Sequence, residues 1–197
     1  MNKLQLILSV VVCTMILLLA FSLYFYRKPT IYTYRLESPQ IVRGPAFGRV
    51  MSIKHNIPLD TYFIAIFLSP FDIHYQLNPI DGIIQSQRYD ATGKYELAYD
   101  LNKSQDNEKC ITTYVEPIFK NKVELYQIAG FVARRIRSYV RPQQQVQKGQ
   151  LMGLILLGSR VDLIIHNASH FELLVQENEY VFGSQTRIGT WNVEQIK

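Results

Sequence analysis

The chain has 197 residues, of which 48% are hydrophobic, and its 21 Lys and Arg against 16 Asp and Glu give a formal net charge of +5. This length holds one domain and a short appended segment. The 2 cysteines are too few for a disulfide framework, and the 4 histidines show no metal-ligand spacing. Neither a disulfide-stapled domain nor a metal site is therefore expected.

An almost continuous apolar run extends from Leu4 to Tyr26 without a charged residue. As a helix it is long enough to span a bilayer. The run ends in three aromatic residues followed by Arg27 and Lys28, whereas a cleavable signal peptide would end a shorter apolar core with small residues. We expect residues 1–28 to be a retained, single-pass N-terminal membrane anchor. Basic residues lie on both sides of the run, so its orientation stays open.

Beyond the anchor, residues 29–197 have the pattern of one all-β domain. Short runs of β-branched and aromatic residues recur between Pro and Gly residues, without a long amphipathic helix, which predicts a sandwich or a barrel-sandwich hybrid with few short helices. Parts of the pattern resemble the half-barrels of biotinyl and lipoyl carrier domains, but no lysine sits at a hairpin tip. The runs are Ile31–Arg35, Gly48–Ile53, Tyr62–Leu68, Gly82–Tyr89, Ile111–Val115, Val123–Ile128, Val132–Val140, Leu151–Leu157 and Val161–His166.

The charge of this domain is nearly balanced, but basic residues cluster in one part of it. Residues 1–28 hold 3 basic and no acidic residues, so 21 − 3 = 18 basic and 16 acidic residues remain, which does not indicate a nucleic-acid binder. Residues 134–160 nevertheless contain several basic residues and no acidic one. Behind an anchor, such a patch fits anionic lipid better than DNA, and a solvated strand face is the alternative. Its members are Arg134, Arg135, Arg137, Arg141, Lys148 and Arg160.

Three stretches together resemble the phosphatidylserine decarboxylase family, most closely its short, archaeal-like branch. They are FLSPFDIHYQLNPIDG at 67–82, VELYQIAGFVARRI at 123–136 with VQKGQLMGLILLGSRVDLII at 146–165, and a weaker NEK at 107–109. In order and spacing the resemblance covers about residues 40–190. Gly158-Ser159 is a weak motif alone, and it gains weight in the frame of the other stretches.

The resemblance implies a self-cleaving enzyme that makes its own pyruvoyl cofactor. In the family the serine hydroxyl, here that of Ser159, attacks the carbonyl of the preceding glycine, here Gly158. The chain is then cut into fragments 1–158 and 159–197, which stay together, and residue 159 becomes the pyruvoyl group. The implied reaction converts phosphatidylserine into phosphatidylethanolamine and CO2, with a related amino-acid-bearing phospholipid as an open alternative. The sequence leaves homo-oligomers possible.

The resemblance also implies the remaining site residues. His74 matches the family's Asp-x-His motif and is the expected acid and base, since imidazole titrates near neutral pH. A hydrogen-bonded histidine packed beside strands is the structural alternative. Asp72 lies two residues earlier, on the same face if the segment is extended, where it could orient the imidazole or help to place substrate. An exposed turn aspartate after Ser-Pro is the other interpretation.

Three arginines are candidates for binding the lipid head group, because a guanidinium suits phosphate and carboxylate. Arg160 directly follows the predicted cleavage serine, and Arg134 and Arg135 lie in the ARR stretch. For the latter two, a solvated membrane-facing edge is the alternative interpretation.

One position departs from the family pattern. The family carries a Pro-Ala-Asp-Gly-like motif whose aspartate completes a relay for self-cleavage, and the matching stretch GPAFGRV at 44–50 has Phe47 in its place. Asp72, Asp81 or Asp162 could substitute. The second hypothesis is therefore an unprocessed, non-catalytic relative that binds lipid or a membrane partner.

Overall fold

The computed structural model describes residues 2–131, 135–155 and 159–192. One α-helix, α1 (Lys3–Phe25), precedes a domain built from strands and three short 3-10 helices, η1 (Lys103–Asp106), η2 (Ala168–His170) and η3 (Gly183–Gln185). The strands are β1 (Ile41–Arg43), β2 (Phe47–Asn56), β3 (Thr61–Leu68), β4 (Tyr75–Leu77), β5 (Gly82–Asp90), β6 (Lys109–Val115), β7 (Lys122–Ala129), β8 (Ile136–Ser138), β9 (Gln145–Val146), β10 (Leu151–Ile155), β11 (Ser159–His166), β12 (Phe171–Leu173), β13 (Tyr180–Phe182) and β14 (Arg187–Trp191).

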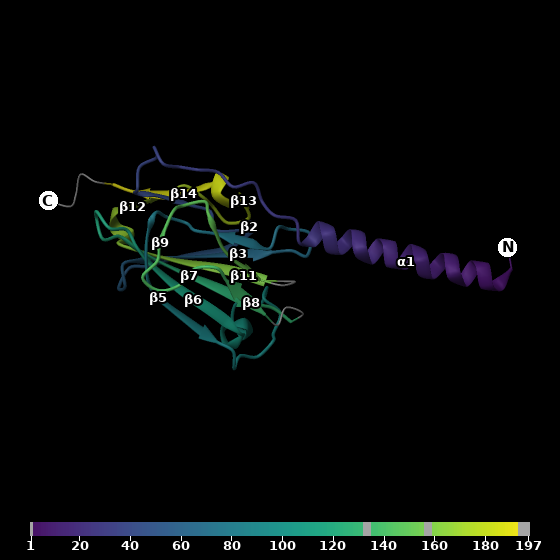
Figure 1. The fold of residues 1–197 in the computed structure, drawn as a ribbon. Coiled ribbons are helices and arrows are strands. Elements are labelled where there is room, and N and C mark those ends of the chain that lie inside the picture. The colour runs from purple at the N-terminus through teal and green to yellow at the C-terminus, as the bar shows by residue number, and fades with distance from the viewer. Residues whose placement is uncertain (1, 132–134, 156–158, 193–197) are drawn as a thin grey trace.

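The strands form one large sheet and two small ones. The large sheet has the order β13-β2-β3-β11-β7-β6-β5-β9, and the small sheets have the orders β1-β14-β12 and β4-β10-β8. The large sheet curls into a half-barrel (Figure 1). The prediction of a mostly β fold with an N-terminal helix is thus confirmed, down to the half-barrel shape.

The core lies on the concave side of the large sheet. Alternate residues along its central strands are fully buried, as expected when successive side chains point to opposite faces. Burying each such side chain contributes about 1.5–3 kcal/mol. The inward residues of the three central strands are Ile64, Ile66, Leu68, Val123, Leu125, Val161, Leu163 and Ile165.

The helix α1 stands apart from this core as a separate rod (Figure 1). It has 23 residues, which span about 34 Å at 1.5 Å per residue. Asn2 and Gln5 form a capping box at its start, and Phe25, in its last turn, is its one described buried residue. The helix is long and apolar enough to cross a membrane, in agreement with the predicted run from Leu4 to Tyr26.

The predicted strand over Ile31–Arg35 is wrong, because that segment packs as irregular chain. The Tyr34 hydroxyl donates to the Ser184 carbonyl at 2.8 Å, so the aromatic side chain docks the segment without strand pairing. Further along, the fully buried Lys148 donates to the Ser38 carbonyl at 2.7 Å and lies 3.5 Å from the Glu37 carboxylate. These contacts fix the connection between α1 and β1.

Lys148 and Arg160 are therefore not members of a continuous basic surface. Lys148 is 1% exposed and Arg160 is 2% exposed, and both make hydrogen bonds inside the domain. Two of the basic residues between 134 and 160, Lys148 and Arg160, therefore lie in the interior of the domain.

Candidate active site

Ser159 begins β11, the strand at the centre of the half-barrel. It lies opposite Leu68 of β3 and Ala129 of β7, and its side chain points to the same face as Val161. The residue is completely buried, and its hydroxyl oxygen has no hydrogen-bond partner among the described residues. Most buried polar atoms in proteins have a partner, so this hydroxyl is an exception that needs a chemical reason. The predicted cleavage partner Gly158 lies outside the described residues.

His74 lies beside the end of β10. Its carbonyl accepts a hydrogen bond from the Ile155 amide at 3.2 Å, while Leu68 lies opposite Ser159. Ile155 ends β10 and Ser159 begins β11, and four residues of chain span at most about 14 Å. The antiparallel contacts therefore bring His74 to the end of β10 that leads into the predicted cleavage site.

One hydrogen bond of the His74 ring defines its tautomer. Nδ1 lies 2.8 Å from the Asp72 carbonyl oxygen, and because a carbonyl can only accept, Nδ1 carries the proton. Nε2 then carries the lone pair. This atom is buried and has no partner among the described residues. His74 thus presents a free basic nitrogen inside the domain.

Burial also decides the charge of His74. It lowers the pKa of the imidazole to about 4, because the charged form loses its hydration. The Asp72 carbonyl and carboxylate oppose this shift, and the nearby Arg27 guanidinium adds to it. The ring is therefore neutral at pH 7 and is able to accept a proton.

Asp72 contacts His74 through its backbone, and the expectation that it lies on an extended strand is wrong. It lies in a turn after β3, where its carboxylate accepts from the Ser69 amide at 2.7 Å and from the Tyr180 hydroxyl at 2.6 Å. These bonds hold the turn, and the turn places the Asp72 carbonyl at His74 Nδ1. Asp72 therefore orients the imidazole, by its carbonyl oxygen.

A pair of buried glutamines, not identified from the sequence, joins the site to the sheet. The Gln76 amide donates to the His74 carbonyl at 2.6 Å, and the Gln127 amide donates to the Gln76 side-chain oxygen at 2.8 Å. Gln127 lies opposite Val161, hence on the Ser159 face of the sheet, and its own side-chain oxygen has no described partner. A side chain at Gly153 would approach the Gln127 amide to 2.5 Å, so glycine leaves room for this contact.

The aromatic ring of Phe25 is a second contact that the sequence did not reveal. Its centroid lies 4.2 Å from that of the His74 imidazole, with 37° between the two planes. The last turn of α1 thus borders the histidine.

Phe47 and the aspartates proposed to substitute for the relay aspartate lie in different parts of the domain. Phe47 is buried at the start of β2, opposite Phe182, and its ring lies where a side chain on Gly183 would be. Asp81 accepts from the Lys148 amide at 2.9 Å, and Asp162 is paired with an arginine. Of the three carboxylates proposed as substitutes for the relay aspartate, Asp72 is the one that adjoins His74.

Arg160 points away from Ser159, to the outer face of β11. Its guanidinium donates to Asp162 at 2.7 Å, to the Ala98 carbonyl at 3.0 Å and to the Ser104 hydroxyl at 2.5 Å. Burial raises the pKa of Asp162 to about 6, against the pull of the guanidinium. Arg160 thereby fastens the segment around η1 to the sheet.

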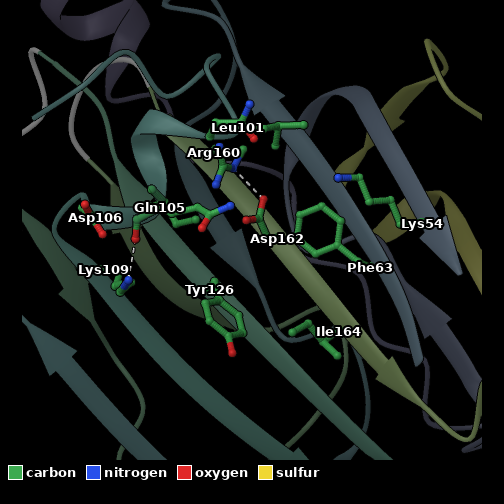
Figure 2. Close-up of a pocket in the computed structure, with 12 residues that line it drawn as sticks. Lys54, Phe63, Leu101, Gln105, Asp106, Lys109, Tyr126, Arg160, Asp162 and Ile164 are labelled. Carbon is green, nitrogen blue, oxygen red and sulfur yellow. Dashed lines mark hydrogen bonds and ion pairs between the residues drawn. The ribbon is translucent and has the colours of Figure 1, made fainter. Parts of the chain in front are cut away.

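Arg160 and Asp162 form part of the wall of a cavity of about 390 Å³, shown in Figure 2. Lys54, Phe63 and Tyr126 also line it, and its lining includes neither His74 nor Ser159. This cavity therefore lies on the face of the sheet opposite the serine.

The other two arginines give less information. Arg135 is exposed just before β8, and Arg134 lies outside the described residues. In the part of the chain that the structure describes, no group of three or more His, Cys, Asp or Glu side chains could hold a metal ion.

The described residues thus form a curled β domain that encloses a serine hydroxyl and a neutral histidine, neither of which has a described partner at Oγ or Nε2. The chain also matches the family model described as phosphatidylserine decarboxylase over residues 19–189. The chain belongs to the phosphatidylserine decarboxylase family.

Curated relatives agree with this assignment. A phosphatidylserine decarboxylase proenzyme of Amoebophilus asiaticus is 37% identical over 172 residues, which cover 84% of this chain and 73% of the relative. One of Chlorobaculum parvum is 38% identical over 76% of this chain and 70% of the relative. One of Carboxydothermus hydrogenoformans is 34% identical over 88% of this chain and 81% of the relative. The predicted family is thus confirmed.

Proposed function

We propose that the chain is a membrane-anchored proenzyme that cuts itself before Ser159 and then decarboxylates phosphatidylserine to phosphatidylethanolamine and CO2. The observation that carries this proposal is the pair of buried atoms without a described hydrogen-bond partner, Ser159 Oγ and His74 Nε2. Ser159 begins β11, and His74 is bonded to the last residue of β10. The family relationship supports the reaction. The proposed division is an anchor at 1–28 and a catalytic domain at 29–197.

In the cleavage step, His74 Nε2 takes the proton of the Ser159 hydroxyl, since a serine is a weak nucleophile without an adjacent base. The oxygen attacks the carbonyl carbon of Gly158, and the peptide bond becomes an ester. Elimination then removes the Cα proton of residue 159 and breaks its bond between Cβ and Oγ. Fragment 1–158 ends in a new carboxylate, and addition of water to the resulting dehydroalanine with loss of ammonia gives a pyruvoyl group on fragment 159–197. The buried Ser159 hydroxyl, which has no partner among the described residues, fits this conversion.

The substitution of Phe47 for the relay aspartate does not remove the orienting contact of the base. In serine-protease triads, replacing the aspartate by asparagine lowers the rate by about 10⁴, because the histidine takes the wrong tautomer. Here the Asp72 carbonyl, which can only accept, selects the tautomer with the proton on Nδ1. His74 Nε2 therefore stays basic without a carboxylate at position 47.

After cleavage the two fragments would remain one domain. β11 begins at Ser159 and pairs along its length with β3 and β7, which belong to fragment 1–158. β13 and β14 of the small fragment pair with β2 and β1. Separating the fragments would break the central strand pairings and expose the core.

A pyruvoyl group supplies a carbonyl that condenses with the substrate amine and draws the electron pair released with CO2. His74 lies where it could hold and return the proton that replaces CO2. The substrate is a phospholipid, and α1 would keep the domain at the bilayer that contains it. The exposed Arg135 remains a candidate for the head-group phosphate.

The test is CO2 release from carboxyl-labelled phosphatidylserine in mixed micelles by the purified full chain. We expect wild-type protein to release labelled CO2 and the Ser159→Ala variant to release none. Thr112→Ala, on β6 two strands from β11, is the matched hydroxyl control and should remain active. Absence of CO2 release from correctly folded wild-type protein would contradict the proposal and favour a non-catalytic lipid-binding relative.

A further inference from the structure

The C-terminal end of α1 contains a buried residue, whereas the described residues before it are exposed or partly exposed. Phe25 is 2% exposed, whereas Leu23, two residues earlier, is 68% exposed. The Phe25 ring lies on the His74 imidazole, with centroids 4.2 Å apart. An anchor that served only to hold the domain at the membrane would need no contact with the histidine.

A second contact fastens the helix end to the turn that orients His74. The Arg27 guanidinium donates to the Phe71 carbonyl at 2.8 Å and to the Tyr24 carbonyl at 2.8 Å. Phe71 lies in the turn that also contains Asp72, whose carbonyl binds His74 Nδ1. The helix end, the turn and the imidazole are therefore one connected unit.

The phenyl ring covers the imidazole with an apolar surface. Removing water from an imidazole disfavours its charged form, and a flanking ring also limits its rotation. The charged groups that face His74 are the Asp72 carboxylate from its own turn and Arg27 from beyond α1, and Ile155 on β10 is apolar. Among these neighbours, Phe25 belongs to α1, and its effect on His74 is to exclude water.

We propose that Phe25 is a positioning residue of the active site, so that the anchor helix completes the catalytic centre in cis by covering His74 and keeping its imidazole neutral. The role in catalysis rests on the proposed function, whereas the cover on His74 is a property of the uncut chain. A domain cut away from α1 would keep Ser159 and His74 and lose this cover.

The first test follows the His74 imidazole by NMR titration of the full-length Ser159→Ala chain in lipid nanodiscs. This uncut chain reports on the contact without any catalytic step. We expect Phe25→Ala to raise the pKa of His74 by about one to two units, toward the value of a solvated imidazole. Phe25→Leu keeps an apolar cover and should leave the titration nearly unchanged. Leu23→Ala, which removes an exposed apolar side chain of the same helix, is the matched control.

The second test measures the pH dependence of self-cleavage in chains that retain Ser159. If the pKa of His74 is about 6 in Phe25→Ala, its neutral form falls about tenfold at about pH 5, and cleavage should slow by a similar factor there and much less at pH 8. Phe25→Leu should restore the wild-type profile. A general loss of folding would instead lower the rate at every pH.

The outcomes separate this inference from the proposed function. An unchanged His74 titration in Phe25→Ala would overturn the inference, whatever the enzyme does. A wild-type chain that never cuts itself would contradict the proposed function, and a shifted His74 titration in Phe25→Ala would then still establish the cover while removing its catalytic meaning.

Discussion

The buried polar side chains on the two faces of β11 differ in their hydrogen bonding. On the inner face, the Ser159 hydroxyl has no described partner. On the outer face, Arg160 binds Asp162, Ala98 and Ser104. A polar group that is buried and satisfied fastens one part of a fold to another, whereas one that is buried and unsatisfied costs stability and is retained for another reason. The difference agrees with the proposed chemistry on the inner face and with a structural role for the outer face.

The strongest test of the inner face is the His74→Gln variant. Without the base, self-cleavage should slow by about 10²–10⁴-fold, the usual contribution of a positioned general base. Gel densitometry of freshly synthesised chain over time measures the rate. His166→Gln, which changes a partly exposed histidine paired with Glu124, should cut at the wild-type rate. Normal cleavage in His74→Gln would assign the base to another residue.

The outer face is tested by removing one member of its ion pair. Arg160→Met leaves Asp162 buried without its partner and should lower the free energy of unfolding by about 3–5 kcal/mol. Replacing both residues, Arg160→Met with Asp162→Leu, should recover most of that loss. Urea denaturation in detergent, followed by tryptophan fluorescence, measures both. A stable Arg160→Met chain that cuts itself but no longer binds lipid head groups would instead make Arg160 a substrate-binding residue.

The neutral state of His74 predicts a pH effect on stability. Its folded pKa of about 4 lies below the ordinary 6.5, so the unfolded chain binds the proton first as the pH falls. His74 therefore makes the uncut Ser159→Ala chain less stable from about pH 6.5 down to about 4, by about 3 kcal/mol in total. His74→Leu in the same background should lack this fall. The raised pKa of Asp162 acts with the opposite sign in both chains and cancels in their difference.

A smaller effect is expected at the turn that supports the site. Tyr180→Phe removes the hydrogen bond to the Asp72 carboxylate and should cost about 1 kcal/mol of stability. Tyr139→Phe is the control, because Tyr139 is 46% exposed. Thermal unfolding in detergent measures both variants. Equal losses in the two would show that the Tyr180 hydroxyl does not hold the turn.

Much of the fold was predictable from sequence because alternating apolar residues and Pro or Gly breaks are local signals. Gln127 gave such a signal as well, since it interrupts the inward series of Val123, Leu125 and Ala129 on one strand. The same period of two separates Ser159 from Arg160, although adjacency suggested a shared site. The two-residue period of a strand assigns each side chain to one face of the sheet, so it could have placed Ser159 and Arg160 on opposite faces.

The contact between Phe25 and His74 could not be predicted in this way. Hydropathy assigns Phe25 to the apolar N-terminal helix, and its burial depends on where the chain docks after the helix ends. The orienting carbonyl of Asp72 was equally hidden, because a backbone atom leaves no mark in the residue type. Sequence supplied the candidate residues Ser159 and His74, and tertiary packing supplied the contacts around them.

The most direct test of the central claim is the intact mass of the purified, detergent-solubilised full chain. Cleavage by Ser159 predicts two fragments, 1–158 and 159–197, the smaller with a pyruvoyl group at its N-terminus. The Ser159→Ala variant should give one uncut chain. A single mass of 22.9 kDa from folded wild-type protein would contradict self-cleavage at this serine.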